Sequence, residues 1–255
     1  MATTTIKLAR LNGEPEIFHS IQGEGVSMGI PSVFVRASLC NLHCIWCDTD
    51  YTWNWENTPW KHEKDTDPQY RKFKKEDYLI EMNTDEMAEK IAAIPCPRVI
   101  ITGGEPLLQD EAWQSLIEHL LPRNSDYYFE IETNGTITPS PELDHEIHQY
   151  NVSPKLTNSG NSPALRINGK ALAFFSKSPK AWFKFVVTSE SDLAEINELI
   201  KEHCLPRHRI LLMPEGRDDA TLEKRRLWLA EICREQGFRF SDRLHIQLWG
   251  SKRGV

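Results

Sequence analysis

Three cysteines lie within eight residues of one another, in the run Cys40-Asn-Leu-His-Cys44-Ile-Trp-Cys47. They follow residues 31–39, an apolar segment rich in β-branched and aromatic residues that predicts a strand. A structural zinc site usually needs four protein ligands. A [4Fe–4S] cluster held by three thiolates keeps one iron open for a small molecule. The spacing therefore favours a catalytic iron–sulfur cluster at the end of a strand.

The other cysteines, Cys96, Cys204 and Cys233, are isolated, and each stands where a small buried residue would serve. We interpret them as structural thiols, although spacing alone leaves open a fourth ligand among them. For the three clustered cysteines, the alternative is a zinc knuckle completed by a distant histidine.

The first residues, MATTTIKLAR, lack the apolar stretch of a secretory signal, and no apolar run approaches the roughly 18 residues of a membrane span. We therefore predict a cytoplasmic protein, in which six cysteines are thiols or metal ligands rather than disulfides. The net charge of −7 gives no general attraction for nucleic acid or an anionic membrane, so neither is expected as a partner.

Short apolar segments alternate with amphipathic segments along the chain. Further strands are predicted over residues 98–103, 127–133, 149–154, 182–187, 209–214 and 244–249. Helices are predicted from Asn83 or Thr84 to Ile94, over 113–120, over 192–200 after a capping box of Ser189 with Asp192, and over 219–233.

Strands that alternate with helices indicate a parallel sheet. About six βα units are too few to close an eight-stranded barrel. We therefore predict the α/β class, with a partial, open TIM-like barrel in a single domain over residues 1–255. Residues 53–80 interrupt the alternation and are predicted to be an inserted excursion. Its tryptophans, Trp53, Trp55 and Trp60, are expected to pack locally.

The strand over 98–103 ends in Gly103-Gly104-Glu105-Pro106. Glycines allow the backbone to approach a ligand closely, and sites in α/β folds gather at the carboxyl ends of strands. This turn is therefore a second candidate for ligand contact.

The cysteine spacing, the aromatic Trp46 before the last cysteine and the Gly-Gly-Glu-Pro turn together resemble the radical S-adenosylmethionine superfamily. The resemblance implies that Cys40, Cys44 and Cys47 hold a [4Fe–4S] cluster whose open iron binds S-adenosylmethionine. It further implies one-electron cleavage to a 5′-deoxyadenosyl radical, with an electron donor such as a flavodoxin or a ferredoxin. Trp46 would lie near the adenine, and Gly104 would contact the cofactor.

Five further segments resemble the 7-carboxy-7-deazaguanine synthase family of queuosine biosynthesis, from about Glu16 to Val255 with residues 53–80 unmatched. That family is a carbon–nitrogen lyase, which converts 6-carboxy-5,6,7,8-tetrahydropterin to 7-carboxy-7-deazaguanine with loss of ammonia. The resemblance implies hydrogen abstraction from C6 of the pterin and contraction of its ring. The segments are Ser20-Ile21-Gln22-Gly23-Glu24-Gly25, Cys47-Asp48-Thr49, Glu132-Thr133-Asn134-Gly135, Ser153-Pro154-Lys155 and the C-terminal Gln247-Leu248-Trp249-Gly250-Ser251-Lys252-Arg253-Gly254-Val255.

The resemblance also implies the site residues. The residues expected to bind the substrate are Ile21, Gln22, Gly23, Arg36, Thr102 and Val255, and those expected to bind the cofactor include Ser153, Pro154 and Lys155. Arg36 could grip the substrate carboxylate as a bidentate fork, and the amide of Gln22 could both donate to and accept from the pterin edge. Glu24 could pair with the amino-pyrimidine donors, and Met213–Glu215 could face the adenosyl group.

The family needs Mg²⁺, and its protein ligand corresponds to Thr49. The residues alone favour Asp48, which stays as the alternative, because carboxylates are the usual ligands of this ion. We assign no side chain as the general acid or base. The family also implies a homodimer.

Two other functions remain open from the sequence. A glycyl-radical-enzyme activating protein shares the cysteine spacing but would act on a protein partner and would not need the Ser20–Gly25 loop. A non-catalytic iron–sulfur or zinc protein would not cleave S-adenosylmethionine.

Overall fold

A computed structural model describes residues 4–255, so the first three residues of the predicted domain lie outside the described part. One mixed sheet of eleven strands forms the centre, in the order β11-β10-β9-β8-β7-β6-β4-β1-β2, with β3 beside β4 and β5 beside β1. The strands are β1 Thr5–Leu11, β2 Glu14–Pro15, β3 Ile17–Ile21, β4 Pro31–Ala37, β5 Leu79–Asn83, β6 Arg98–Gly103, β7 Tyr128–Thr133, β8 Gln149–Val152, β9 Ala181–Val187, β10 Ile210–Pro214 and β11 Arg239–Phe240.

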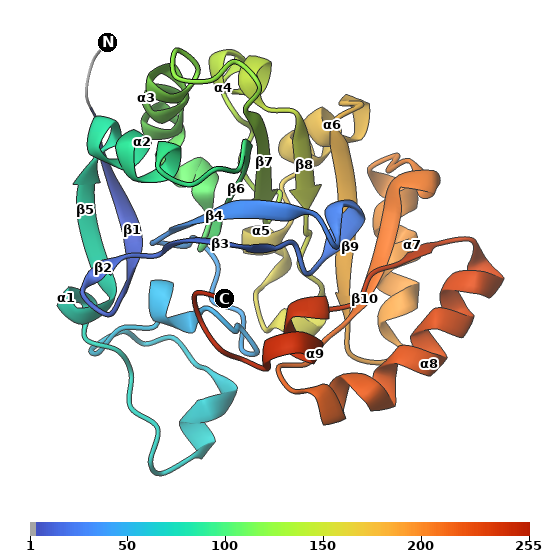
Figure 1. The fold of residues 1–255 in the computed structure, drawn as a ribbon. Coiled ribbons are helices and arrows are strands. Elements are labelled where there is room, and N and C mark those ends of the chain that lie inside the picture. The colour runs from blue at the N-terminus through green and yellow to red at the C-terminus, as the bar shows by residue number, and fades with distance from the viewer. Residues whose placement is uncertain (1–3) are drawn as a thin grey trace.

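The predicted partial barrel is confirmed. Strands β4, β6, β7, β8, β9 and β10 are parallel neighbours in that order, and within residues 4–255 the end strands β11 and β2 do not pair with each other. Most of the helices lie along the outside of this curved sheet, whereas α9 lies in front of it near the C-terminus (Figure 1). The helices are α1 Lys75–Tyr78, α2 Thr84–Ala92, α3 Asp110–Leu120, α4 Pro141–Glu146, α5 Pro163–Arg166, α6 Gly169–Lys177, α7 Asp192–Glu202, α8 Asp219–Gln236 and α9 Leu244–Trp249.

The period-two alternation of each strand separates two faces of the sheet. One set of side chains, such as Phe129, Ile131, Tyr150 and Phe183, packs with the buried stripes of the outer helices into the hydrophobic core. The opposite set carries polar groups, including Glu130 on β7, and points into the barrel. The apolar face therefore stabilises the fold, while the inner face is free to build a site.

An antiparallel extension was not predicted from the sequence. Strand β1 pairs with β4 and β5, and β3 pairs with β4 from Ile17↔Val35 to Ile21↔Pro31. The segment that leads into the Ser20–Gly25 loop is therefore strand β3, which lies beside β4, the strand that precedes the clustered cysteines. This pairing fixes where the loop begins.

The prediction of a strand over residues 244–249 is wrong, because these residues form helix α9. Only Ile246 of this helix is buried, whereas Leu248 and Trp249 are exposed. The preceding residue, Arg243, is held by Glu24, Asp48 and the carbonyl of Gly216, and the amide of Leu244 donates to the carbonyl of Gly23. These contacts turn the chain away from the sheet edge after β11.

The insertion is shorter than predicted, because Leu79 and Ile80 already belong to β5. Its tryptophans do pack within the fold: Trp53 is buried, and Trp55 donates to the carbonyl of Tyr51. In Figure 1 the segment projects below the open end of the barrel before it returns to β5. No helix within residues 4–255 is both long and apolar enough to cross a membrane.

Candidate active site

A cavity of about 770 Å³ opens at the carboxyl ends of the parallel strands. This volume lies within the usual range of small-molecule sites. The loop at Ser20–Gly25, the cluster loop at Cys40–Cys47 and the C-terminal tail at Gly250–Val255 also line the cavity. Residues singled out from the sequence that line it are Ile21, Gln22, Gly23, Arg36, Trp46, Thr49, Thr102, Gly104, Ser153, Met213, Pro214, Glu215 and Val255.

The three clustered cysteines are free thiols, and each sulfur accepts a hydrogen bond from nitrogen. The amide of Leu42 donates to Cys40 Sγ at 3.4 Å, Asn161 Nδ2 donates to Cys44 Sγ at 3.4 Å, and Trp53 Nε1 donates to Cys47 Sγ at 3.4 Å. Nitrogen donors around cysteine sulfur are a normal feature of iron–sulfur sites, because they stabilise the anionic ligands. The donors thus fit a cluster held by these residues.

The electrostatic surroundings of the three cysteines also favour binding of a positively charged metal centre. Burial raises the pKa of all three thiols, that of Cys47 to about 12, and neighbouring acidic groups add to the effect. Bound iron would supply the missing positive charge. Across residues 4–255 no three His, Cys, Asp or Glu side chains are placed to share a single metal ion. A cubane differs from such a site, since each thiolate binds a different iron.

The Gly-Gly-Glu-Pro turn packs tightly against the start of the cluster loop. A Cβ at Gly104 would lie 1.9 Å from the carbonyl oxygen of Leu39, so only glycine fits there. The buried carboxylate of Glu105 accepts from the amides of Leu107 and Asn134 and from the hydroxyl of Thr133. Glu105 therefore joins the ends of β6 and β7, and burial raises its pKa.

Of the residues predicted to bind the cofactor, Trp46, Lys155 and Ser153 are linked by contacts in the structure. Trp46 Nε1 donates to the carbonyl of Asn158 at 3.0 Å, and Lys155 Nζ lies 5.8 Å from the centre of its ring. Lys155 Nζ also donates to Ser153 Oγ at 2.9 Å. Pro154 and Lys155 are not among the residues that line the cavity, whereas Ser153 is.

Arg36 shares a buried carboxylate with the C-terminal tail. Arg36 Nε lies 3.1 Å from Glu16 Oε1, and Arg253 lies 2.6 Å from Glu16 Oε2 and stacks on Tyr51 at 3.6 Å. Glu16 is 2% exposed. Neither terminal nitrogen of Arg36 has a hydrogen-bond partner in the part of the chain that the structure describes. The two terminal nitrogens of the Arg36 guanidinium are therefore available to bind an anion in the cavity.

Gln22 and Thr102 meet at a third residue, Glu132 on β7. Gln22 Nε2 donates to Glu132 at 3.0 Å, and Thr102 Oγ1 donates to it at 2.6 Å. The other groups of the Gln22 amide are also engaged, since it donates to Glu130 at 3.3 Å and accepts from the amide of Glu24 at 3.1 Å. The predicted pair therefore orients a carboxylate that lines the cavity.

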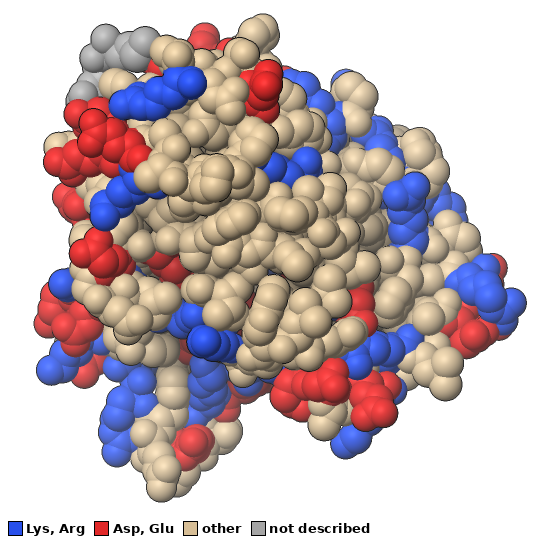
Figure 2. Space-filling model, viewed as in Figure 1, with Lys and Arg blue, Asp and Glu red and all other residues tan. Residues whose placement is uncertain are grey.

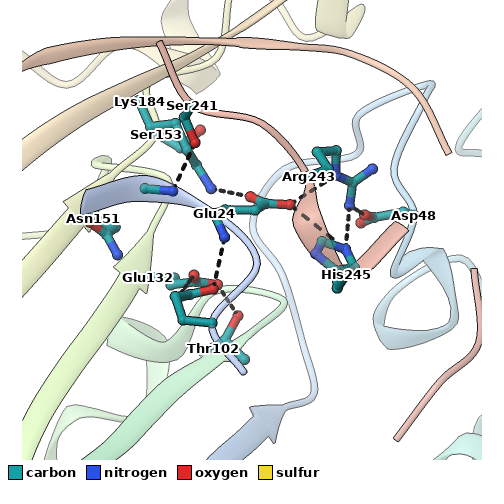
Figure 3. Close-up of polar contacts among 12 residues, drawn as sticks. Glu24, Asp48, Thr102, Glu132, Asn151, Ser153, Lys184, Ser241, Arg243 and His245 are labelled. Carbon is teal, nitrogen blue, oxygen red and sulfur yellow. Dashed lines mark hydrogen bonds and ion pairs between the residues drawn. The ribbon is translucent and has the colours of Figure 1, made fainter. Parts of the chain in front are cut away.

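Glu24 is the centre of an ionic network that crosses the cavity wall (Figure 3). One oxygen bonds Lys184 of β9, and the other lies 2.8 Å from Arg243 Nε. A terminal nitrogen of Arg243, Nη2, bonds Asp48. Burial opposes ionisation of Glu24, but Lys184 and Arg243 outweigh it and hold its pKa well below the usual range. Both oxygens of Glu24 are occupied by these cations, so the structure does not support the expected pairing of Glu24 with the substrate.

Thr49 and Asp48 differ in what already binds them. The hydroxyl of Thr49 makes no helix-capping bond and lies 3.5 Å from Cys47 Sγ. The carboxylate of Asp48 bonds Arg243, which outweighs burial and holds the pKa of Asp48 low. Thr49 is therefore the freer oxygen ligand at this position.

Sequence reasoning missed Glu132 as a site residue, and also Asn151, Lys184, Arg243 and His245, which all line the cavity. The first three had a signal, because each is a polar residue that alternates with mainly apolar residues along its strand. Arg243 and His245 had none, because they reach the site only through contacts between distant parts of the chain: a Cβ at Gly23 would lie 2.1 Å from His245 Nδ1.

Comparison with known proteins gives consistent matches. A family model described as the Radical SAM superfamily matches residues 35–246. The 7-carboxy-7-deazaguanine synthase of Pyrobaculum aerophilum is 37% identical, covering 94% of this chain and 95% of that protein. The enzyme of the same name from Halobacterium salinarum is 35% identical, covering 92% and 89%. The crystal structure of QueE from Escherichia coli has a similar fold, with a TM-score of 0.64 at 24% identity over 94% of this chain and 95% of that one.

Proposed function

The chain belongs to the radical S-adenosylmethionine superfamily and, within it, to the 7-carboxy-7-deazaguanine synthases, and on that premise we propose that it converts 6-carboxy-5,6,7,8-tetrahydropterin to 7-carboxy-7-deazaguanine with loss of ammonia. One structural observation supports this proposal in addition to the family assignment. The free end of Arg36 and the oriented carboxylate of Glu132 line the same cavity as Trp46, next to the cluster loop.

This arrangement matches a pterin that carries a carboxylate. The guanidinium of Arg36 can bind the carboxylate through two parallel hydrogen bonds. Glu132, held by Gln22 and Thr102, can accept from the amino and amide N–H groups of the pterin edge. Ile21, Gly23 and Val255 supply the remaining wall around the substrate.

When bound by Cys40, Cys44 and Cys47, the [4Fe–4S] cluster supplies one-electron cleavage of S-adenosylmethionine. The residues of the chain position the reactants and exclude water. Trp46, Gly104 and Ser153 face the cofactor side of the cavity, and Lys155 supports Ser153. Pro154 follows Ser153 in the chain and does not itself line the cavity. The electron comes from a donor such as a flavodoxin or a ferredoxin.

The test is an anaerobic reaction of the reconstituted protein with S-adenosylmethionine, reductant and 6-carboxytetrahydropterin, followed by mass analysis. We expect a product of the mass of 7-carboxy-7-deazaguanine. Cofactor cleavage that needs a protein partner, with no pterin turnover, would instead favour a glycyl-radical-enzyme activating protein. No cleavage by a cluster that can be reduced would favour a non-catalytic role.

We further propose that the hydroxyl of Thr49 would hold Mg²⁺, which would help to bind and orient the substrate, because Asp48 is already paired with Arg243. Mg²⁺ keeps waters and shares substrate oxygens, so a single protein ligand suffices. Thr49→Val, which removes only the hydroxyl, should raise the Mg²⁺ concentration needed for half-maximal turnover by roughly tenfold or more. Activity of the parent should fall when a chelator removes Mg²⁺.

Asp48→Asn separates the alternative ligand. It weakens the contact with Arg243 and should lower the overall rate, but it should leave the Mg²⁺ requirement unchanged. The assignment is wrong if Asp48→Asn shifts the Mg²⁺ titration and Thr49→Val does not. Both variants should keep the cluster, which the visible absorption of the loaded protein measures.

A homodimer is proposed from the surface shown in Figure 2. The centre of this face carries few Lys, Arg, Asp or Glu residues, and Figure 1 places β3, β4 and α9 there. Exposed apolar side chains of this region include Ile30 and Leu248, at 41% and 51% exposure. Such a patch is typical of a surface covered by a partner.

Light scattering should therefore give twice the chain mass of 29.5 kDa for the parent. Leu248→Glu should shift the mass toward one chain at micromolar concentration. The matched control is Leu227→Glu on α8, where the side chain is 73% exposed and lies outside the patch. A parent that stays monomeric at all concentrations would contradict the proposal.

We propose that the insertion belongs to the same single domain as the barrel, because His62 Nε2 lies 2.9 Å from the carbonyl of Cys47. We also propose a cytoplasmic location, a compartment that suits six free cysteines and an oxygen-sensitive cluster.

A further inference from the structure

The insertion contacts the cluster loop at its third cysteine. The indole Nε1 of Trp53, at the start of the insertion, donates a hydrogen bond to Cys47 Sγ at 3.4 Å. Trp53 is 3% exposed, so water does not compete for this donor. An indole N–H is a donor only, and a buried one requires an acceptor. The sulfur of Cys47 is that acceptor.

Several contacts fix the position of the Trp53 indole. The ring of His43, inside the cluster loop, meets it edge-on with the centroids 5.1 Å apart, and the ring of Trp60 stacks on His43 with the centroids 3.6 Å apart. The backbone amide of Trp53 donates to the carbonyl of Asp50 at 3.1 Å. The N–H therefore cannot turn away from the sulfur without repacking this aromatic group.

The insertion also holds the backbone of the cluster loop. His62 Nε2 lies 2.9 Å from the carbonyl oxygen of Cys47, and the amide of Glu63 donates to the carbonyl of Ile45 at 2.8 Å. The imidazole of His62 is fixed in turn by the amide of Lys64, which donates to its Nδ1 at 3.2 Å. The insertion therefore holds both the donor, the indole of Trp53, and the backbone that carries the acceptor, the sulfur of Cys47.

The donors to the other two cysteines have different origins. Cys40 receives its bond from the amide of Leu42 within the cluster loop, and Cys44 receives its bond from Asn161 on the far side of the site. Cys47 alone, among the three, accepts from a side chain of the insertion. Changing Trp53 therefore alters one sulfur and leaves the other two donors in place.

We propose that Trp53 is a positioning residue that raises the reduction potential of the [4Fe–4S] cluster. The reduced cluster carries one more negative charge than the oxidised cluster, and part of it resides on the cysteine sulfurs. A hydrogen bond to such a sulfur stabilises the reduced state more than the oxidised state, so it makes reduction easier. The inference rests on the proposed function, because it requires a cluster at these cysteines.

The test uses the full-length protein with its cluster reconstituted. Trp53→Phe removes the N–H and keeps an aromatic ring in the buried position. At a fixed solution potential, electron paramagnetic resonance should show the ratio of reduced to oxidised cluster fall by about threefold to tenfold. A tenfold fall corresponds to about 59 mV for a one-electron couple.

Trp55→Phe is the matched control. Trp55 lies in the same insertion, but its Nε1 donates to the carbonyl of Tyr51 at 3.2 Å and not to a sulfur. It should leave the potential unchanged. An equal shift in both variants would mean that packing of the insertion, not the N–H, sets the potential, and an unchanged potential in Trp53→Phe would overturn the proposal directly.

If Trp53→Phe does not retain a cluster, the parent protein decides the question. Protein made with ¹⁵N in the tryptophan indoles should show a coupling between that nitrogen and the reduced cluster in pulsed resonance spectra. Absence of the coupling would overturn the proposal. Failure of the proposed function is distinguishable, because then the parent would form no reducible cluster or would not turn over the pterin.

Discussion

Replacing Cys40, Cys44 or Cys47 with alanine is expected to abolish cleavage of S-adenosylmethionine. Each cysteine would bind a different iron, and no other cysteine lies beside them in the cluster loop. Loss of one thiolate therefore removes a ligand that nothing replaces. Iron analysis and the resonance signal of the reduced protein should show a lost or altered cluster, and chromatography should detect no 5′-deoxyadenosine above background.

Cys96→Ala is the control for these variants. Cys96 is buried in the hydrophobic core, and its thiol donates to the carbonyl of Pro31 at 3.5 Å. Its loss should cost about 1 kcal/mol of unfolding free energy and leave the cluster intact. Full cofactor cleavage by any one of the three variants, or a zinc-loaded and colourless parent after anaerobic reconstitution, would refute the assignment.

Arg36→Lys should weaken binding of 6-carboxytetrahydropterin by roughly 30-fold to several thousand-fold. That range corresponds to about 2–5 kcal/mol for breaking a buried charged pair. Lysine keeps the positive charge but cannot form two parallel bonds to a carboxylate. Glu16 would still be paired with Arg253, so the loss should reflect the substrate contact and not an unpaired carboxylate. Calorimetry or fluorescence titration of the loaded enzyme would measure the affinity.

Cleavage of S-adenosylmethionine provides an internal control for the substrate-binding role assigned to Arg36. Cleavage of S-adenosylmethionine without pterin should survive in Arg36→Lys. Arg239→Lys on β11 is the matched control, because that guanidinium stacks on Trp182 and lies outside the cavity. If Arg36→Lys bound the pterin as tightly as the parent, another group would have to hold the carboxylate.

The parallel part of the barrel could be predicted because its strands are short, apolar and bounded by turn residues. Strands β6, β7, β9 and β10 begin and end within one residue of the predicted ranges. The antiparallel extension could not, since strands such as β1 gain their partners only through tertiary pairing. The six residues 244–249 alternate as a strand would, but so short a pattern does not exclude a helix.

The site shows a similar division. Residues within motifs, such as Arg36 and Thr102, could be located from the sequence because local chain neighbours fix them near the cluster loop. Their partners could not, because Glu16 is joined to Arg253 across 237 positions. The role predicted for Gln22 also shows this limit: the sequence identified the residue, but the bond to Glu132 depends on the pairing of distant strands.

The separation of Glu24 from its partners has a consequence for how the protein is made. Lys184 and Arg243 follow Glu24 by 160 and 219 positions. At about 5–20 residues per second, Arg243 is synthesised roughly 10–40 s after Cys47. A buried carboxylate without its cations is costly, so the loop around Glu24 should stay hydrated during that interval. The cysteines therefore emerge from the ribosome well before the wall that shelters them, so their loop stays open to solvent during that interval.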